Sequence, residues 1–336
     1  MGGLARKATI IDEIRSEIGV QPIIVDAGNL FFKKSQPSVG IANDINKINA
    51  GVILEAFNEM GCDAFSVGEN DLSNGLDYLV NLKNKANFPF ISANIADSNN
   101  NLIFSPYIVI ESGVNIGFVG LASKFKHSDV NVLDPFNSLE NIIEEVRSKS
   151  DVVVLLFNAN DDNLAKLQKS DLGVDLIIRS KSKKRSNDGG KKRIPAYSSG
   201  DRGKYLYRLD LKLSQSGLPI TDITAQKNII DNAKKRLERM KKGDDQINLK
   251  EFYKDDPQML NRILGYDKQL ELARQKLDDS RNIVELISYE LGKTVLDKPN
   301  ILKIIDKGKE KINLIKGPNM DTKGRLPGDP HHGHSH

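Results

Sequence analysis

Short hydrophobic runs that end in clusters of polar residues recur through the first half of the chain. Four of them are strand-like, and the polar residues that follow them begin at Asp26, Gly68, Asn158 and Arg179. In sheets that alternate strands with helices, the carboxyl ends of the strands carry the binding crevice. We therefore expect the functional side chains of this chain at these four positions.

The segments between these runs repeat their apolar residues at the spacing of a helix. Helices are expected over residues 5–18, 43–59, 76–86, 139–149 and 164–170. Strands are expected over residues 23–25, 64–67, 89–95, 108–111, 114–120, 152–157, 175–178 and 205–213. Ser112 and Gly113 join two of these strands as a hairpin. Strand–helix alternation with one antiparallel hairpin predicts a layered α/β sandwich.

After residue 223 the composition shifts to charged, helix-forming residues with few glycines. Two long helices, over residues 226–241 and 257–279, are expected to form an antiparallel helical arm. Asp267 and Arg274 fall where a strict heptad would place apolar residues. Either the arm packs sideways on the α/β domain, or a partner covers it.

Two further helical segments are expected beyond the arm, over residues 283–296 and 300–315, and the second is clearly amphipathic. The remaining residues are rich in proline, glycine and aspartate, which predicts a flexible tail. The predicted organisation is an α/β domain over residues 1–222, helices over 223–316 and the tail over 317–336.

The composition is that of an ordinary globular protein. Of the 336 residues, 39% are hydrophobic and 28% are charged, and no apolar run approaches the roughly 18 residues of a membrane helix. No signal peptide is recognisable in the sequence. The net charge of +4 does not indicate a dedicated nucleic-acid binder. Cys62 is the single cysteine, which excludes an internal disulfide, and its apolar surroundings predict a buried, inert thiol.

Several short stretches together resemble the 5′-nucleotidase branch of the calcineurin-like metallophosphoesterases. They follow one another in the order of that family: Gly2–Ala8, Ile24–Gly28, Asn58–Ala64, Ser92–Ile95, Ile116–Leu121 and Gly203–Leu206. No single stretch is specific, but the set extends over about the first 210 residues. The resemblance implies a layered αββα sandwich of the metallophosphoesterase type. Residues 291–315 are in turn similar to the segment that joins some phosphoesterase modules to multihaem cytochrome domains, although this chain has no haem attachment motif.

The resemblance also implies where relatives bind two divalent metal ions. Their ligands are an Asp-x-His on a first strand, the Asp that ends Asp-x-Gly-Asp, the Asn and His of Gly-Asn-His-Glu, an isolated His, and a Gly-His-x-His. The sequence has no counterpart of the first strand, because Met1 stands directly before the Gly-Gly-Leu-Ala-Arg helix. At the other positions every ligand has changed, and the residues found there are Asn29, Glu69, Asn70, Asn158, Lys181 and Lys183.

These replacements remove the chemistry that holds a metal pair. Two-metal hydrolysis needs cations roughly 3.5–4 Å apart, held by carboxylates and imidazoles. Amides are weak ligands, and the ammonium groups of Lys181 and Lys183 have no lone pair to donate. His127 is the only histidine before the tail, so no multi-histidine centre can form. The tail histidines could bind a transition metal weakly, and they are His331, His332, His334 and His336.

Two other sites stay open at the level of sequence. Asp26, Glu69 and Asp71, with Asp161 or Asp162, could form an oxygen-ligand site for a divalent metal such as Mg²⁺ or Mn²⁺. Asp26 alternatively orients the turn at Gly28. A basic loop around a flexible Asn187-Asp188-Gly189-Gly190 turn could bind an anion, although a solvated loop is the ordinary expectation. Its cations are Lys181, Lys183, Lys184, Arg185, Lys191, Lys192 and Arg193.

The sequence thus predicts a catalytically inactive metallophosphoesterase-fold protein that acts as a binding or structural subunit without a cofactor. The alternative is a metal-dependent phosphomonoesterase or 5′-nucleotidase with substituted oxygen ligands. A missing first strand would leave a sheet edge unpaired, so a protein partner or a second copy is expected at that edge or at the arm. By resemblance only, the partner would be a multihaem cytochrome and the location extracytoplasmic.

Overall fold

The computed structural model describes residues 3–215 and 217–317, and these form two compact units. The first unit contains the chain up to Arg185, then Ser198–Leu206, and then the chain from Tyr289 onward. The second unit contains Ser186–Tyr197 and Tyr207–Ser288. The chain therefore leaves the first unit and returns to it, a division that differs from the boundary at residue 222 predicted from composition.

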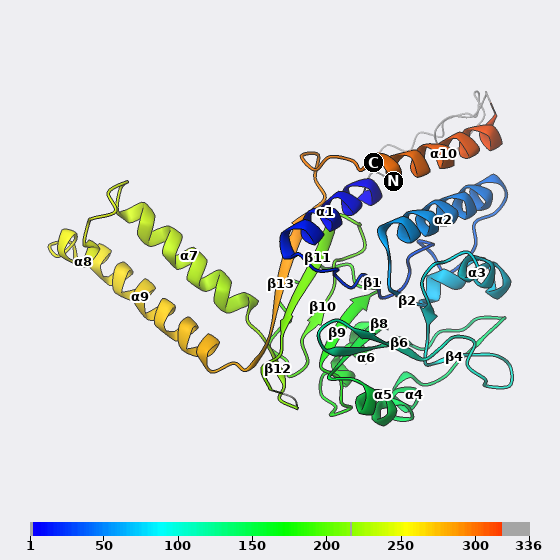
Figure 1. Cartoon of the computed structure of the whole chain (residues 1–336), viewed down its shortest axis with the longest axis horizontal. Coiled ribbons are helices and arrows are strands. Elements are labelled where there is room, and N and C mark those ends of the chain that lie inside the picture. Colours follow the sequence, from blue (N-terminus) through cyan, green and yellow to red (C-terminus); the bar gives the residue numbers. More distant parts are fainter. Residues whose placement is uncertain (1–2, 216, 318–336) are drawn as a thin grey trace, which may run out of the picture. The chain divides into compact units, whose positions relative to one another are not determined.

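The first unit is an α/β sandwich in which two sheets lie between layers of helices (Figure 1). Its first sheet is parallel, in the order β1 (Val25–Asp26), β2 (Ala64–Ser66), β3 (Phe90–Ile91). Its second sheet has, within this unit, the order β9 (Leu176–Ser180), β8 (Val152–Asn158), β6 (Asn115–Ala122), β5 (Tyr107–Glu111). Strands β5 and β6 form the predicted hairpin, and the other two neighbouring pairs are parallel. The hydroxyl of Ser66 donates to the carbonyl of Leu156 at 3.0 Å, which joins the two stacked sheets.

Helices cover the outer face of each sheet. On the side of the first sheet lie α1 (Gly3–Ile18) and α2 (Ile41–Met60), and on the side of the second lie α4 (Pro135–Glu140) and α5 (Ile143–Lys149) (Figure 1). The remaining elements of this unit are α3 (Leu76–Lys83), α6 (Asp161–Leu167), the 3₁₀ helix η1 (Glu69–Leu72), and the antiparallel pair β4 (Ile95–Ala96) and β7 (Asn131–Val132). Gly61, with a φ of 72°, ends α2 in the left-handed conformation that glycine adopts without strain. No helix in residues 3–215 or 217–317 has both the length and the apolar character needed to cross a membrane.

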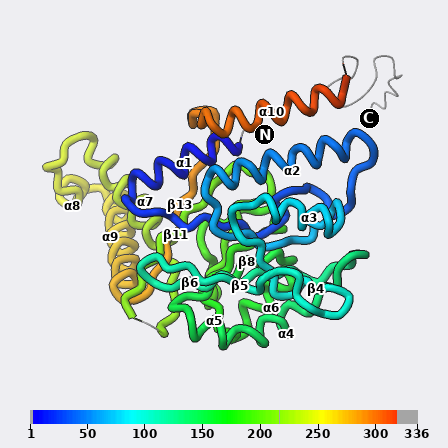
Figure 2. Tube along the Cα trace, turned by 45° about the vertical axis from the view of Figure 1, so that its right-hand side comes forward, coloured from blue at the N-terminus to red at the C-terminus, as the bar shows by residue number. Residues whose placement is uncertain are grey.

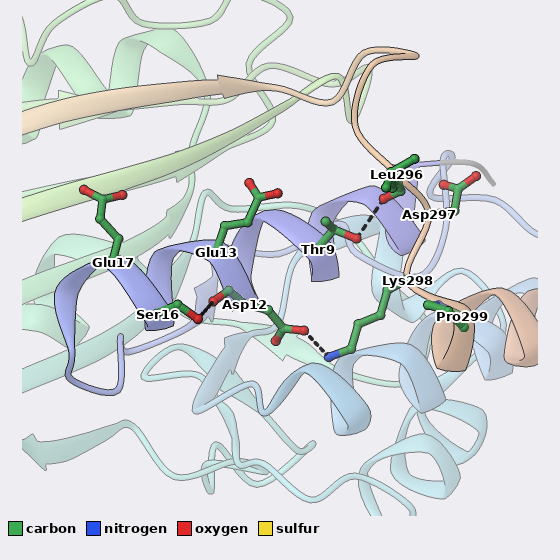
Figure 3. Close-up of a pocket in the computed structure, with 9 residues that line it drawn as sticks. All are labelled: Thr9, Asp12, Glu13, Ser16, Glu17, Leu296, Asp297, Lys298 and Pro299. Atoms are coloured by element: carbon green, nitrogen blue, oxygen red, sulfur yellow. Dashed lines mark hydrogen bonds and ion pairs between the residues drawn. The ribbon is translucent and has the colours of Figure 1, made fainter.

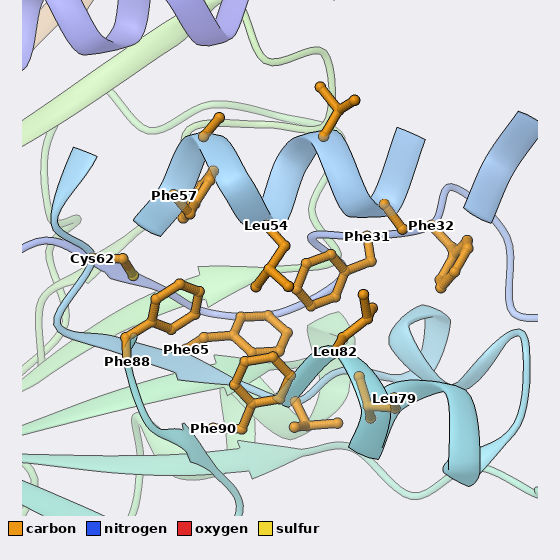
Figure 4. Packing of buried hydrophobic residues seen from close by; sticks show 14 of the residues in the cluster. Phe31, Phe32, Leu54, Phe57, Cys62, Phe65, Leu79, Leu82, Phe88 and Phe90 are labelled. Atoms are coloured by element: carbon orange, nitrogen blue, oxygen red, sulfur yellow. The ribbon is translucent and has the colours of Figure 1, made fainter. Parts of the chain in front are cut away.

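Aromatic side chains fill the core between α2 and the first sheet (Figure 4). The ring of Phe65 on β2 lies 5.2 Å from that of Phe31 and 4.8 Å from that of Phe90, both edge to face. Aromatic pairs of this kind add about 0.5–1.5 kcal/mol beyond the area that they bury. Cys62 is buried beside this cluster, as predicted, and burial raises the pKa of its thiol. The core therefore fixes β1 and β2, whose carboxyl ends carry the first two polar clusters.

The last described helix, α10 (Pro299–Lys316), belongs to the first unit and not to the arm. It runs along α1 and α2 in both views (Figure 2). Its buried residues Ile301 and Ile305 are part of the main core. Gly308 stands against Val52 of α2 so closely that a Cβ at this position would collide with the valine side chain. The predicted amphipathic helix is therefore confirmed, and its apolar face packs on α2.

The segment before α10 is attached to α1 along a pocket on the first unit (Figure 3). The hydroxyl of Thr9 donates to the carbonyl of Leu296 at 2.7 Å. The ammonium of Lys298 pairs with the carboxylate of Asp12 at 2.6 Å. These contacts attach the segment before α10 to α1, within the part of the first unit that begins at Tyr289.

Two predicted elements of the first unit are interrupted. Residues 89–95 form β3 and β4 in different sheets, because the hydroxyl of Ser92 accepts the N–H groups of Asn94 and Ile95 and turns the chain. Residues 139–149 were predicted as one helix but divide between α4 and α5. The carboxylate of Asp134 caps α4, which begins at Pro135. The helix therefore starts four residues before the predicted start at residue 139.

The second unit contains a three-stranded sheet and the predicted helical arm. Its sheet order is β11 (Tyr205–Lys212), β13 (Asn282–Glu290), β12 (Ile220–Asp222). The arm consists of α7 (Thr224–Met240) and α9 (Pro257–Asp278), whose buried contacts include Ile230, Ala233, Leu270 and Ala273. The short elements β10 (Ala196–Tyr197) and α8 (Leu249–Phe252) complete the unit. The predicted pairing of two long helices is confirmed.

The prediction of a helix over residues 283–296 is wrong, because residues 282–290 form β13. Asn282, Val284 and Leu286 are buried while the residues between them are partly exposed, which is the two-residue period of a strand. β13 pairs in parallel with β12, Asn282 opposite Ile220. Its β-branched residues suit a pleated surface better than a helix.

Candidate functional site

The polar clusters after β1, β2, β8 and β9 converge at one edge of the first unit. Asn29 follows β1, Glu69 and Asn70 lie in η1 after β2, Asn158 ends β8, and Lys181 follows β9. Hydrogen bonds join each cluster to at least one other. The strand ends therefore meet as the strand pattern predicted. We call this network of hydrogen-bonded residues the strand-end frame.

Asp71 is the centre of the strand-end frame. Its side chain is fully buried and accepts three backbone N–H groups, from Asn29 at 2.7 Å, Phe31 at 3.0 Å and Gly68 at 2.9 Å. Asn29 and Phe31 belong to the loop after β1, whereas Gly68 precedes η1. A single carboxylate thus ties two strand-end loops together and uses both of its oxygens to do so.

Asn29 adds a second connection between the same loops. Its side-chain oxygen accepts the N–H of Asn70 at 2.9 Å, and its backbone has a φ of 60°, a left-handed conformation that asparagine tolerates. A Cβ on Gly68 would lie 2.6 Å from that oxygen and 2.8 Å from the side-chain nitrogen of Asn158. Only glycine fits this space, so the centre of the frame is tightly packed.

Asn158 connects the two sheets across the frame. It is fully buried, its side-chain oxygen accepts the N–H of Glu69 at 3.3 Å, and its nitrogen donates to the hydroxyl of Ser180 at 2.8 Å. The Ser180 hydroxyl donates in turn to the carbonyl of Ala27 at 2.6 Å. The chain of bonds leads from η1 through β8 and β9 to the loop after β1.

Lys181 closes the frame with an ion pair. Its ammonium contacts the carboxylate of Glu69, and the side chains are 34% and 24% exposed. Lys181 also has a φ of 62°, which is uncommon for a lysine and costs on the order of 1–3 kcal/mol. Asn29 and Lys181, two of the positions where the family resemblance places metal ligands, therefore have unusual backbone conformations.

The structure divides the predicted basic loop between the two units. Lys181, Lys183, Lys184 and Arg185 belong to the first unit, whereas Lys191, Lys192 and Arg193 belong to the second. Lys183 lies in the exposed loop beyond the frame, and the guanidinium of Arg185 stacks 4.2 Å from the ring centre of Tyr205.

The turn predicted to be flexible is anchored within the second unit. Gly189 is buried, and its N–H donates to the carboxylate of Asp222. The hydroxyl of Tyr197 donates to the same carboxylate at 2.6 Å, and burial raises the pKa of that hydroxyl. The turn is therefore anchored at Gly189, because the half-buried carboxylate of Asp222 accepts its backbone N–H.

Sequence reasoning missed three residues of the frame. These are Ser180, Ser123 and His127. Ser123 accepts the N–H of Asn160 through its hydroxyl at 3.0 Å and donates its own N–H to the carbonyl of Asn158 at 2.9 Å. His127 accepts the N–H of Asp129 at Nδ1, so Nε2 carries the proton and donates to the carbonyl of Leu72 at 3.1 Å. Their positions after β6 and at the end of β9 were the only sequence signal.

The residues at the positions where the family resemblance places metal ligands do not fit a pair of divalent metal ions. The side-chain oxygens of Asn29 and Asn158 already accept backbone N–H groups, and Lys181 places a positive charge beside Glu69. Over residues 3–215 and 217–317, no three histidine, cysteine or acidic side chains are grouped so that they could hold a metal. The predicted tail ligands His331, His332, His334 and His336 lie outside the described residues.

The carboxylates of the alternative acidic site are engaged with the protein itself. Asp26 accepts the N–H of Gly28 at 2.9 Å, which is the turn-orienting role weighed for it. Burial raises the pKa of Asp26, while the charge of Lys7 opposes that shift. Asp71 accepts three backbone N–H groups, and Glu69 is paired with Lys181. Asp161 pairs with Arg179 at 2.6 Å.

Asp71 gives the stability a defined pH dependence. Burial raises the pKa of Asp71 to about 7, against the lowering effect of its three N–H donors. Because the unfolded pKa is about 4, folding binds a proton between these values, and the free energy of unfolding falls as the pH rises from about 4 to about 7. The slope from this group is at most about 1.4 kcal/mol per pH unit.

We expect Asp71→Asn, which cannot ionise, to show a weaker decline in the free energy of unfolding between pH 5 and pH 8. Asp26 and Asp63, whose pKa values burial also raises, remain in both proteins and account for the residual slope. Urea denaturation followed by circular dichroism at a series of pH values measures the difference. Equal slopes for the two proteins would contradict the role assigned to Asp71.

Known proteins with similar sequences are nucleotide phosphoesterases, although no protein-family model matches the chain. The 5′-nucleotidase of Vibrio cholerae is 26% identical over 161 residues, which are 44% of this chain and 28% of that protein. The trifunctional nucleotide phosphoesterase YfkN of Bacillus subtilis is 23% identical over 260 residues, which are 64% of this chain and 18% of that protein. The matched segments thus span less than a third of these relatives.

A solved structure has the same fold. The calcineurin-like phosphoesterase YfkN from Bacillus subtilis aligns with a TM-score of 0.59 and 17% sequence identity, covering 93% of this chain and 90% of that chain. At this identity the likeness concerns the fold alone. It agrees with the α/β sandwich of the first unit.

Proposed function

We propose that this chain, which is related in sequence to the 5′-nucleotidase-type metallophosphoesterases and shares their fold, is a catalytically inactive subunit that acts by binding. The observation that carries the proposal is the strand-end frame. The family resemblance places metal ligands at certain positions of the chain. At these positions the structure has amides, a carboxylate and an ammonium group, which are bound to other protein groups. These oxygens already accept protein donors, and the ammonium of Lys181 adds a positive charge, so a dication would have to compete with protein groups for every ligand.

The chemistry of the donors supports the same conclusion. Divalent cations exchange their hydration shell only for several well-placed oxygen or nitrogen ligands. Here a metal would have to displace Lys181 from Glu69 and the backbone N–H groups from Asn29 and Asn158. The frame needs no metal to hold its loops, because protein groups already connect them.

The second candidate is a metal-dependent phosphomonoesterase or 5′-nucleotidase with substituted oxygen ligands. The names of the related proteins favour it, as does the presence of Asp26, Glu69 and Asp71 at the same edge. In that case Mg²⁺ or Mn²⁺ would be the cofactor, bound by carboxylates released from their present partners. The two candidates differ in whether the protein binds metal stoichiometrically.

Metal content and phosphate release separate the candidates. We expect the 336-residue chain, dialysed against Mn²⁺, Mg²⁺ or Zn²⁺, to retain less than one equivalent of metal and to show no metal-dependent hydrolysis of p-nitrophenyl phosphate or AMP. Elemental analysis and a phosphate assay measure both quantities. The control carries alanine in place of the tail histidines, His331, His332, His334 and His336. Stoichiometric metal together with turnover in this control would decide for the enzyme.

The binding role implies a protein partner, for which the arm and the edge of the first sheet are the surfaces proposed from sequence. Within the described residues β1 is the outer strand of its sheet, with β2 as its neighbour. An extracytoplasmic location and a multihaem cytochrome partner are part of the same proposal, and they rest on the family resemblance.

A further inference from the structure

Six exposed lysines lie in the loops that the strand-end frame holds together. They are Lys33, Lys34, Lys124, Lys126, Lys183 and Lys184, and we call this set the lysine crown. Each stands within three residues of a residue bonded in the frame. Lys33 and Lys34 follow Phe31, whose N–H Asp71 accepts, and Lys183 and Lys184 follow Lys181.

The loop that carries Lys124 and Lys126 is tied to the same frame. Ser123 is bonded to Asn158 and Asn160 on one side, and His127 is bonded to Leu72 at the end of η1 on the other. The three pairs of lysines therefore stand on loops that are fixed to one another by hydrogen bonds. The six lysines come from three separate parts of the sequence, and the fold connects the loops that carry them.

The acidic side chains of these loops do little to neutralise the lysine crown. Glu69 is paired with Lys181 and Asp161 with Arg179, and Asp71 is buried. Asp129 accepts the N–H of Leu76 and the hydroxyl of Ser128, and because both donors are neutral it keeps its negative charge as one carboxylate among the six lysines. Within the described ranges, none of the six lysines forms an ion pair. The edge consequently presents unpaired positive charge although the whole chain carries only +4.

The floor beneath the lysine crown is closed. Gly68 has no room even for a Cβ, because Asn29 and Asn158 stand against it. A small ligand is held by a concave pocket that buries most of its surface. Exposed lysines above a packed floor instead suit a broad contact, in which the field steers an oppositely charged surface to the protein.

From these observations we infer that the lysine crown is a docking surface for an acidic segment of a partner protein, and that docking needs no metal ion. The inference rests on the proposed function, because it requires the former metal positions to be filled by protein groups. The occupant is a polypeptide whose aspartate and glutamate side chains meet the six ammonium groups.

A labelled peptide of sixteen glutamates, followed by fluorescence anisotropy in the presence of EDTA, tests the inference on the full chain. We expect saturable binding that weakens at least about tenfold when the salt concentration rises from about 20 mM to about 200 mM. The variants Lys124→Gln/Lys126→Gln and Lys183→Gln/Lys184→Gln should each weaken binding about fivefold or more.

The matched control is Lys303→Gln/Lys307→Gln on α10. These lysines are exposed, stand one turn apart and belong to the same unit, but they lie outside the strand-end frame. We expect this variant to bind within about twofold of the unmodified protein, because it removes the same charge elsewhere. Equal weakening by control and crown variants would show attraction to net charge only and would overturn the inference.

Four other outcomes would also overturn it. Displacement of the peptide by stoichiometric inorganic tripolyphosphate would reveal a site for a small phosphoanion, and tighter binding of a sixteen-nucleotide DNA strand through the same lysines would reveal a nucleic-acid surface. Absence of peptide binding from a protein that also binds no metal would refute the docking surface while leaving the proposed function intact. A requirement for Mn²⁺ would instead count against both.

Discussion

Replacing Asp71 with alanine is expected to lower the free energy of unfolding of the first unit by about 3–5 kcal/mol. The reason is that three backbone N–H groups, of Asn29, Phe31 and Gly68, would lose their acceptor at once. A buried donor left without a partner costs about 1–3 kcal/mol, and partial rearrangement of the loops recovers some of the sum. Urea denaturation followed by circular dichroism measures the loss.

Two variants make this result specific to Asp71. Glu13→Ala removes an exposed carboxylate from α1, far from any cap, and is expected to change the free energy of unfolding by about 0.5 kcal/mol at most. Asp71→Asn keeps one acceptor oxygen and should fall between the alanine variant and the unmodified protein. A loss below about 1 kcal/mol for Asp71→Ala would show that water or other groups satisfy these donors as well as the carboxylate does.

Long, strongly periodic segments were predictable from the sequence. The helices α1, α2, α7 and α9 and the hairpin of β5 and β6 lie within a few residues of the predicted ranges. In these segments the apolar spacing, the proline at the start of α9 and the turn at Ser112-Gly113 all favour the same structure. The convergence of the strand ends followed from the parallel arrangement of β1, β2, β8 and β9.

Other parts of the fold depend on contacts that a sequence pattern does not contain. Ser92 breaks a hydrophobic run with a local side-chain turn, and the side chain of Asn94 then bonds the carbonyls of Ala122 and Leu133. The segment that became β13 is apolar enough for either a helix or a strand, and its place between β11 and β12 decides the outcome. The return of α10 to the first unit depends on the contact of Gly308 with Val52.

The candidate site, like the fold, was predictable from the sequence only in part. The order of the family-like motifs drew attention to Asn29, Glu69, Asn158 and Lys181, which the structure brings to one edge of the first unit. It could not supply their bonding, since Lys181 and Glu69 are 112 residues apart in sequence and follow strands of different sheets. Ser180 resembles any strand-end serine until its hydroxyl is placed between Asn158 and Ala27.

Placing the metal-ligand residues of the resembled family at six positions of this chain is expected to create Mn²⁺ binding at least about 100-fold tighter than that of the unmodified chain. The variant combines Asn29→Asp, Glu69→Asn, Asn70→His, Asn158→His, Lys181→His and Lys183→His. It supplies a carboxylate and imidazoles, removes two ammonium groups, and breaks the bonds that now consume the donors. Calorimetric titration of Mn²⁺, in proteins whose tail histidines are alanine, measures the affinity.

The control for this prediction removes the positive charge without adding a ligand. Lys181→Met/Lys183→Met eliminates both ammonium groups but offers only thioethers, which are poor partners for a hard cation. If this control binds Mn²⁺ as tightly as the restored variant, repulsion alone had kept metal away and the four remaining positions are adequate ligands. If the restored variant folds and still binds no Mn²⁺, the strand ends do not hold these residues in a coordinating arrangement. Binding by the restored variant alone places the loss of metal in the ligands themselves, which is the physical basis of the inactive-subunit proposal.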